Sequence, residues 1–291
     1  MGSSILLVKL SLRASSAGGL PWFVGHECRA GFLRMVSQLD PELATLMHEG
    51  SGEGGRRRAV FSLKPLSFLS GYELVFPEPR LSRFPVDGNV VFEQGAKAEM
   101  SVAILREETA SRFVAAVLPK VQGLRIDVKG HLFEVERLEF EVVHTESVLK
   151  GETFEEVSLR FETPTYFNPL RGNAKYKVLY PDTTLLFASL VATAHQLTAE
   201  SYPKPEELAE QVYISGLDIK TPYVKEASHE APTGFVGWVN LKPKEEADKD
   251  VRRTILGLLR LGELTNVGGN RSGGYGVIRA EVDREKNTRK K

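Results

Sequence analysis

The sequence predicts an α+β protein built from two similar domains in tandem. Strand and helix patterns alternate along the chain, and the second half repeats the order of the first. Each half approximates strand, helix, two or more strands, helix and strand, which is the split βαβ order of a ferredoxin-like (RRM-like) domain. A chain of 291 residues, 42% of them hydrophobic, is long enough for two domains of ordinary size.

The first half begins with an apolar strand over 4–13. Apolar residues at helical spacing predict a helix over 26–38, and Asp40 followed by Pro41 is a typical start for a second helix over 41–48. The glycines of 50–55 end this second helix. The other predicted elements of this half are strands at 58–69, 72–76, 90–93 and 98–104, with a turn at Ser70-Gly71, a helix at 109–117, and a hairpin of 124–128 with 131–143.

The second half repeats this order. We expect a strand, an apolar helix, two strands, an amphipathic helix and a last strand, over 154–162, 181–198, 212–220, 233–241, 249–264 and 275–282. The predicted N-terminal domain is therefore 1–147 and the C-terminal domain is 148–284. The charged tail at 285–291 is expected to be disordered.

The composition limits the function. The chain has 38 basic and 38 acidic residues and a formal net charge of zero, so any contact with nucleic acid must come from local clusters of lysine and arginine. The single cysteine, Cys28, excludes a disulfide scaffold and a zinc site of several thiolates, and no histidine pair has the spacing of metal ligands. No apolar run approaches the roughly 20 residues that span a membrane, and no signal peptide is evident. We therefore expect a cytoplasmic protein without a metal, a cofactor or a membrane partner.

A glycine-rich loop lies between the last predicted helix and the last predicted strand. Its five glycines fall among nine residues, which are Gly268, Gly269, Gly273, Gly274 and Gly276. Each glycine loses more backbone entropy on folding than any other residue, so such a run favours a tight turn or a ligand at the main chain. A dinucleotide fingerprint follows a strand and opens a helix, and a Walker loop needs Gly-Lys-Ser/Thr, so neither fits. Backbone N–H groups beside Arg271 and Ser272 instead predict phosphate binding, and the alternative is a turn without a ligand.

The order of these segments resembles the repeat-associated (RAMP) superfamily of CRISPR proteins. Within it, the chain is similar to the endoribonuclease that cuts CRISPR precursor RNA at its repeats. Segment 41–49 resembles the family's "pro-x-leu-ala-x-x-leu-his", 58–63 its "phe-x-(phe/tyr)-ser" strand, 161–167 its "thr-pro-thr-x-phe", and 233–239 its "gly-phe-x-gly" strand, while the glycine-rich loop completes the set.

The resemblance implies RNA cleavage without a metal ion. In that family a ribose 2′-hydroxyl attacks the adjacent phosphate and leaves a 2′,3′-cyclic phosphate and a 5′-hydroxyl, which needs a base, an acid and cations. The implied partner is CRISPR repeat RNA, with an effector complex or a homodimer as further partners. Two alternatives stay open, a non-catalytic RNA-binding subunit of an effector complex and, more remotely, a small-molecule binding protein.

Catalytic candidates follow from the same resemblance. His48 matches the family's histidine at the end of the "pro-x-leu-ala" helix, and Arg57 lies where some members have a lysine. Arg56 and Arg58 flank it as candidates for phosphate binding. Some members carry a tyrosine in the first helix, which this chain lacks, so His26 is the second catalytic candidate. The structural alternatives are a helix-end histidine favoured by the helix dipole for His48 and a boundary residue for His26.

The predicted RNA-binding residues gather around the loop and the helix before it. Aromatic side chains near the "thr-pro-thr" segment, Tyr166, Phe167 and Tyr176, are candidates for base stacking. A solvated charged surface is the alternative for the arginines. The predicted RNA contacts are Arg252, Arg253, Gly268, Gly269, Asn270, Arg271, Ser272, Gly273 and Gly274.

Overall fold

The computed structural model describes residues 4–50, 59–76, 88–170, 176–222 and 234–283. The chain divides into two units. The N-terminal unit comprises Ser4–Val143 together with Asn270–Tyr275, and the C-terminal unit comprises His144–Gly269 and the segment that begins at Gly276. The tip of the glycine-rich loop, which the sequence placed in the second domain, therefore packs with the first.

The N-terminal unit contains one antiparallel sheet. Its strands follow the order β3-β4-β1-β6-β5, and β2 pairs with the first part of β4. This order is that of a ferredoxin-like domain whose last strand is a hairpin. The strands are β1 Ser4–Ala14, β2 Gly18–Pro21, β3 Phe61–Val75, β4 Asn89–Ile104, β5 Arg125–Val128 and β6 His131–His144.

Two predicted strand pairs are each one long strand. The turn predicted at Ser70-Gly71 is wrong, because β3 runs on to Val75 through a series of register shifts against β4. Gly71 has φ +73°, a value that glycine adopts easily, so the local backbone bulges without reversing. The predicted strands 90–93 and 98–104 are likewise one strand, β4, while the short strand β2 was not predicted.

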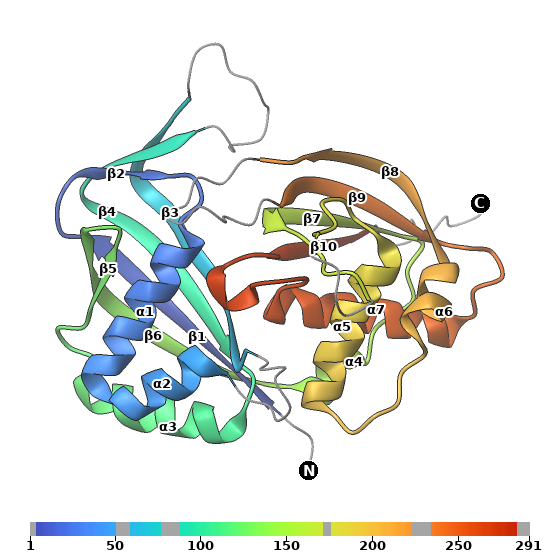
Figure 1. Cartoon of the computed structure of the whole chain (residues 1–291), viewed down its shortest axis with the longest axis horizontal. Coiled ribbons are helices and arrows are strands. Elements are labelled where there is room, and N and C mark those ends of the chain that lie inside the picture. Colours follow the sequence, from blue (N-terminus) through green and yellow to red (C-terminus); the bar gives the residue numbers. More distant parts are fainter. Residues whose placement is uncertain (1–3, 51–58, 77–87, 171–175, 223–233, 284–291) are drawn as a thin grey trace, which may run out of the picture. The chain divides into compact units, whose positions relative to one another are not determined.

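Three helices cover one face of this sheet (Figure 1). They are α1 Gly25–Leu39, α2 Pro41–Glu49 and α3 Glu107–Val117. The predicted cap of α2 is confirmed, because the Asp40 carboxylate accepts a hydrogen bond from the Leu43 N–H at 3.0 Å. Arg112 pairs with the same carboxylate at 2.6 Å and holds its pKa below the usual value. The helices bury an apolar core in which the Phe32 ring contacts those of Phe61 and Phe113.

The C-terminal unit has the same plan. Its antiparallel sheet has the order β10-β7-β9-β8, the ferredoxin-like order, so the predicted tandem fold is confirmed. The predicted helices 181–198 and 249–264 are present as α5 and α7, whereas the short helices α4 and α6 were not predicted. The elements are α4 Thr145–Leu149, β7 Glu156–Thr165, α5 Thr183–Leu197, α6 Pro205–Glu210, β8 Val212–Lys220, β9 Phe235–Pro243, α7 Lys249–Thr265 and β10 Ile278–Asp283.

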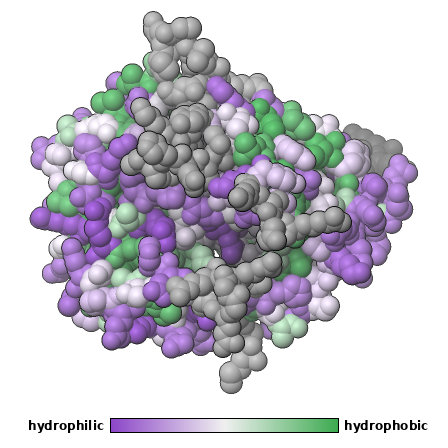
Figure 2. Space-filling view, in the orientation of Figure 1, coloured by the Kyte–Doolittle hydropathy of each residue, from purple (hydrophilic) through white to green (hydrophobic). Residues whose placement is uncertain are grey.

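Strand β8 is an edge of the C-terminal sheet. Figure 2 shows hydrophobic side chains gathered over it, and Tyr213, Ile214 and Leu217 are exposed there.

No helix in the described part of the chain is both long enough and apolar enough to cross a membrane.

The loop tip lies against the start of α1 in the N-terminal unit. A Cβ atom at Gly25 would overlap the carbonyl oxygen of Gly273, and one at Gly274 would lie 3.0 Å from the Gly25 Cα and 3.3 Å from Pro65 of β3. Gly274 also has φ +80°. The two backbones can approach this closely only because these positions lack side chains.

We expect Gly25→Ala to destabilise the N-terminal unit by about 1–3 kcal/mol, because the added methyl group must push the loop tip away. Helix propensity alone predicts the opposite sign, since alanine is the better helix former. Denaturant unfolding followed by circular dichroism measures the change. The control is Ser37→Ala at an exposed position of the same helix, which we expect to leave stability within about 0.5 kcal/mol. A Gly25→Ala protein as stable as the wild type would contradict the close contact.

Candidate active site

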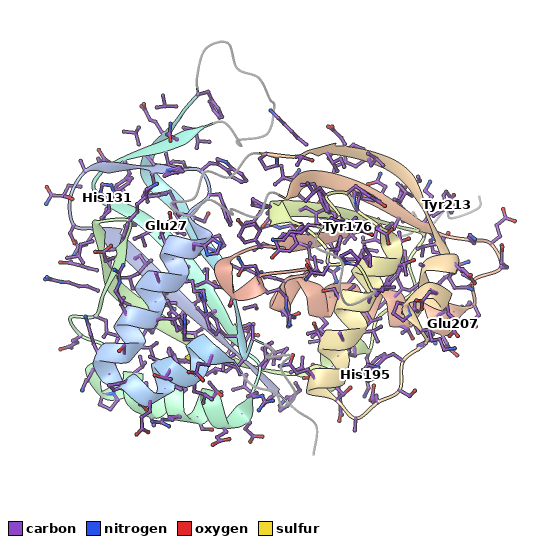
Figure 3. The ribbon with its side chains drawn as sticks, in the orientation of Figure 1. Glu27, His131, Tyr176, His195, Glu207 and Tyr213 are labelled. Atoms are coloured by element: carbon purple, nitrogen blue, oxygen red, sulfur yellow. The ribbon has the colours of Figure 1, made fainter. Side chains whose placement is uncertain are left out.

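His26 lies in the first turn of α1 and contacts the loop tip. Its Nε2 is 3.0 Å from the amide nitrogen Nδ2 of Asn270. The side chain of Tyr275 is fully buried, and its ring meets the imidazole edge-on with 5.6 Å between centroids. Glu27, labelled in Figure 3, marks the same turn of the helix. His26 is thus held by two residues that are far away in sequence but belong to the same unit.

His48 lies in the last turn of α2 and is exposed. Nη2 of Arg29 on α1 lies 3.3 Å from the His48 Nδ1 and 3.3 Å from its carbonyl oxygen. A guanidinium has no acceptor, so in this contact Nδ1 accepts and the proton of the neutral ring is on Nε2. Arg29 thereby links the first half of α1 to the end of α2. The sequence analysis did not single out this residue.

Arg29 differs from the arginines around it. Burial lowers the pKa of its guanidinium, its Nε is buried without a hydrogen-bond partner among the described residues, and no carboxylate of the described chain pairs with it. Arg34 on the same helix, in contrast, pairs with Asp127. A partly desolvated cation without a counter-charge attracts an anion such as a phosphate.

These residues form one candidate site in the N-terminal unit. His26 and Arg29 are three residues apart, so they share a face of α1, and Arg29 reaches His48 at the end of α2. We call His26, Arg29 and His48 the histidine–arginine strip. Two imidazoles can accept and donate protons near neutral pH, and the guanidinium between them can stabilise negative charge. No spacing rule could have predicted the link between Arg29 and His48, because it depends on how α1 packs on α2.

The glycines of the loop have packing roles. Gly268 and Gly269 press against Tyr166 in the C-terminal unit, and a Cβ at Gly276 would overlap the backbone of Val267. Most N–H groups of the loop already donate within the protein. The N–H groups of Gly268 and Gly269 donate to Ser189 Oγ and to the Tyr166 carbonyl. Those of Gly273 and Tyr275 both donate to the Asn270 carbonyl. The Gly274 N–H donates to the Arg271 carbonyl and the Gly276 N–H to the Pro164 carbonyl.

These six N–H groups are therefore not available to a phosphate. The residues between the two glycine pairs, Asn270, Arg271 and Ser272, are half-exposed, whereas Gly273 and Gly274 are buried. If the loop touches RNA in this conformation, these three residues supply the contact.

The other predicted arginines differ in their surroundings. Arg56, Arg57 and Arg58 lie outside the described residues. Arg252 has a side chain only 19% exposed and donates to the carbonyls of Ala247 and Lys244, so it stabilises the C-terminal unit. Arg253 is more exposed and pairs with Asp250. The internal bonds of Arg252 leave it little surface for RNA.

Two of the three predicted stacking residues are wrong. Tyr166 and Phe167 are buried, because the backbone after β7 turns them into the core of the C-terminal unit. Phe167 packs there against Phe235, and the Lys177 Nζ lies 4.0 Å from the Tyr166 ring centroid. Tyr176, labelled in Figure 3, is 66% exposed and can still stack a base.

The outer face of the N-terminal sheet carries paired charges. Lys9 pairs with Glu99, and Arg13 pairs with both Glu134 and Glu136. RRM domains that bind RNA on the sheet do so with exposed aromatic residues. Among the described residues of β1, β4 and β6, none of the exposed large hydrophobic side chains is aromatic. The helical side, with the histidine–arginine strip, is therefore the better candidate for RNA contact.

Cys28 has no role in this site. It is fully buried in the core, where burial raises the pKa of its thiol to about 12. Among the described residues, no three His, Cys, Asp or Glu side chains gather as a metal site would require.

Comparisons with known proteins extend these observations. Residues 159–278 match the family model described as CRISPR-associated endoribonuclease Cas6. Comparison with curated proteins gives no match. Among solved structures, Thermus thermophilus Cas6 is similar over 97% of this chain and 100% of that chain, with a TM-score of 0.66 and 18% identity.

Two further structures agree on the fold. A Cas6 in complex with a substrate mimic matches over 96% of this chain and 100% of its own, with a TM-score of 0.64 and 19% identity. A protein described as an RAMP protein binding different RNA substrates matches over 95% and 99%, with a TM-score of 0.57 and 12% identity. Residues 159–278 therefore resemble the CRISPR-associated endoribonuclease Cas6 family, in agreement with the resemblance found in the sequence, and the chain shares the fold of these solved structures.

Proposed function

We propose that the protein is an endoribonuclease that cuts CRISPR precursor transcripts within their repeats to give mature guide RNAs. Cleavage proceeds without a metal ion. A ribose 2′-hydroxyl loses its proton to a base and attacks the adjacent phosphate, and the 5′-oxygen leaves with a proton from an acid. The products are a 2′,3′-cyclic phosphate and a 5′-hydroxyl.

The histidine–arginine strip is the observation that carries this proposal. The family match covers 159–278 and so supports the class of protein, but neither His26 nor His48 lies within it. The proton-transfer groups must therefore be argued from the N-terminal unit itself. There the structure supplies two histidines and a cation linked through one helix, which is the set that the reaction needs.

We assign the base to His48 and the acid to His26. His48 is exposed and accepts from Arg29 through Nδ1, so its ring is neutral in this contact, as a base must be. When a phosphate attracts the Arg29 guanidinium, Nδ1 is released to take the proton of the 2′-hydroxyl. His26 then protonates the leaving oxygen. Arg29 and Arg57 stabilise the negative charge of the transition state, with Arg56 and Arg58 on flanking phosphates.

RNA contacts outside the strip follow from the loop and the C-terminal unit. We propose that Arg271 and Ser272, half-exposed at the loop tip, and Arg253 on α7 bind RNA phosphates. The glycines place the loop tip and are not themselves the main contact. Assembly into a homodimer or an effector complex stays a prediction from the resemblance.

His48→Ala should slow cleavage of the repeat RNA by about 100-fold or more in EDTA, because general acid–base catalysis contributes about 10²- to 10⁴-fold. Single-turnover assays on a labelled transcript of the repeat nearest to the gene give the rate, and the product end should be a 2′,3′-cyclic phosphate. The matched control is His195→Ala, which removes another exposed histidine in the last turn of a helix, α5 (Figure 3), and should leave the rate unchanged.

Two other outcomes would test the choice of His48 as the base and the proposed endoribonuclease function separately. If His48→Ala has no effect while His26→Ala abolishes cleavage, the base is misassigned but the endoribonuclease survives. A wild-type protein that cuts no repeat RNA under these conditions overturns the enzyme itself.

Arg29→Ala should lower the single-turnover rate by about 10- to 100-fold, because the transition state loses the cation that lies beside His48. Arg29→Lys keeps the charge but loses the planar fork, so we expect an intermediate rate. Arg34→Ala is the control, since Arg34 is exposed on the same helix and pairs with Asp127. Melting temperatures of the three variants show whether a loss of rate follows a loss of folding. Equal effects of the Arg29 and Arg34 variants would argue against a specific role.

The alternative is a non-catalytic RNA-binding subunit of an effector complex. It shares the fold and the loop but needs no histidine. Under this alternative Arg271→Ala weakens RNA binding and no variant changes a turnover that is already absent. Under both hypotheses RNA affinity falls with salt, because phosphate contacts release counterions. An affinity that is absent at all salt concentrations would instead favour a small-molecule binding protein.

A further inference from the structure

We propose that Asn270 of the glycine-rich loop is a positioning residue for His26 and not primarily an RNA contact. This inference rests on the proposed function, since it assigns a task to a residue that acts through the candidate acid. It makes the tip of the loop a part of the catalytic machinery in the N-terminal unit.

The first support is the direct contact between the two side chains. The Asn270 Nδ2 and the His26 Nε2 are 3.0 Å apart, and both residues belong to the N-terminal unit. The amide nitrogen donates to the lone pair of Nε2, so the neutral ring carries its proton on Nδ1. With the amide flipped, Oδ1 accepts from Nε2–H of the charged ring, and the proton on Nδ1 is the one that passes to the leaving oxygen. The neutral ring then keeps Nε2–H and its bond to Oδ1, so Asn270 holds His26 before and after the transfer.

The second support is the way the loop presents Asn270. Its backbone is left-handed, with φ +55° and ψ +39°, a conformation that asparagine tolerates better than most residues. The side chain folds back over Gly273, where a Cβ atom would lie 2.6 Å from the Asn270 Oδ1. Gly273 therefore leaves the space that the amide occupies.

The third support is that the ring of His26 is confined from another side. Tyr275 meets it edge-on, and Tyr275 in turn packs edge-on against Phe23 with 4.9 Å between centroids. Tyr275 is fully buried, so it cannot touch RNA and acts only through its neighbours. A ring held by a hydrogen bond and by an aromatic wall loses little rotational freedom when substrate binds, and such preorganisation favours the proton transfer.

Asn270→Gly tests the inference, because glycine accepts the left-handed backbone and removes only the amide. We expect the single-turnover rate at saturating repeat RNA to fall about 10- to 100-fold, as for a misplaced catalytic group, while the RNA Kd changes by less than about twofold. Lys129→Gly is the matched control. Among the described residues of the N-terminal unit, Lys129 is the other non-glycine residue with a left-handed backbone, φ +54°, and its replacement should change neither value.

A double-mutant cycle separates positioning from general damage to the fold. In a His26→Ala background, Asn270→Gly should have almost no further effect on the rate, because the residue through which it acts is gone. Additive losses, a loss confined to Kd, or a His26→Ala protein with full activity would each overturn the inference. If the wild type cuts no repeat RNA, the proposed function itself fails, and the two failures are therefore distinguishable.

Asn270→Asp provides a readout that a purely structural role would not move. A carboxylate only accepts hydrogen bonds, so it favours the charged ring with a proton on Nε2. The limb of the pH–rate profile that reports the acid should move up by about one pH unit. The charged and ionisable neighbours on the same elements, Glu27, Arg29, Arg271 and Tyr275, are unchanged in this variant. An unshifted profile would count against the contact in the active protein.

Discussion

The close approach of two backbones, at Gly25 and Gly273, is the constraint on which the candidate site depends. Because neither Gly25 nor Gly274 carries a Cβ, the loop tip can lie directly against the first turn of α1. That contact brings Asn270 and Tyr275 to His26, although about 245 positions separate them in the chain. The glycines lose much backbone entropy on folding, but they allow this contact at His26. This role explains the glycines without a phosphate site built from backbone N–H groups.

The distribution of charge in the N-terminal unit also favours the histidine–arginine strip as the site of RNA contact. Its sheet face carries ion pairs such as Lys9–Glu99 and Arg13–Glu134, whose charges cancel locally and offer a phosphate little. Arg29 is partly desolvated and has no carboxylate partner within the described chain, so its field is not cancelled. A protein of zero formal net charge can attract RNA only through such local imbalance. The uncompensated cation lies beside His48, where the proposed reaction develops negative charge.

Local signals predicted most of the fold, and long-range contacts account for what they missed. Asp40 before Pro41 marks a helix start through a cap that involves only neighbouring residues, and the structure shows the same kind of cap at Asp182 before α5. Gly71 has the signature of a turn, yet pairing with β4 on both sides of it keeps β3 continuous. At the site, both histidines were singled out through the family resemblance, and their catalytic roles stay predictions. Arg29 and the true setting of Asn270 were not predicted, because packing between helices and between distant segments brings them there.

The family match covers only part of the candidate site. Residues 159–278 cover most of the C-terminal unit, but they also contain Asn270–Tyr275, which pack in the N-terminal unit. The matched region therefore reaches His26 through this one segment, while His26, Arg29 and His48 lie outside it. An amide that can either donate or accept suits a histidine in either protonation state. The loop tip therefore positions His26, whereas α1 and α2 carry the residues that we propose transfer the protons.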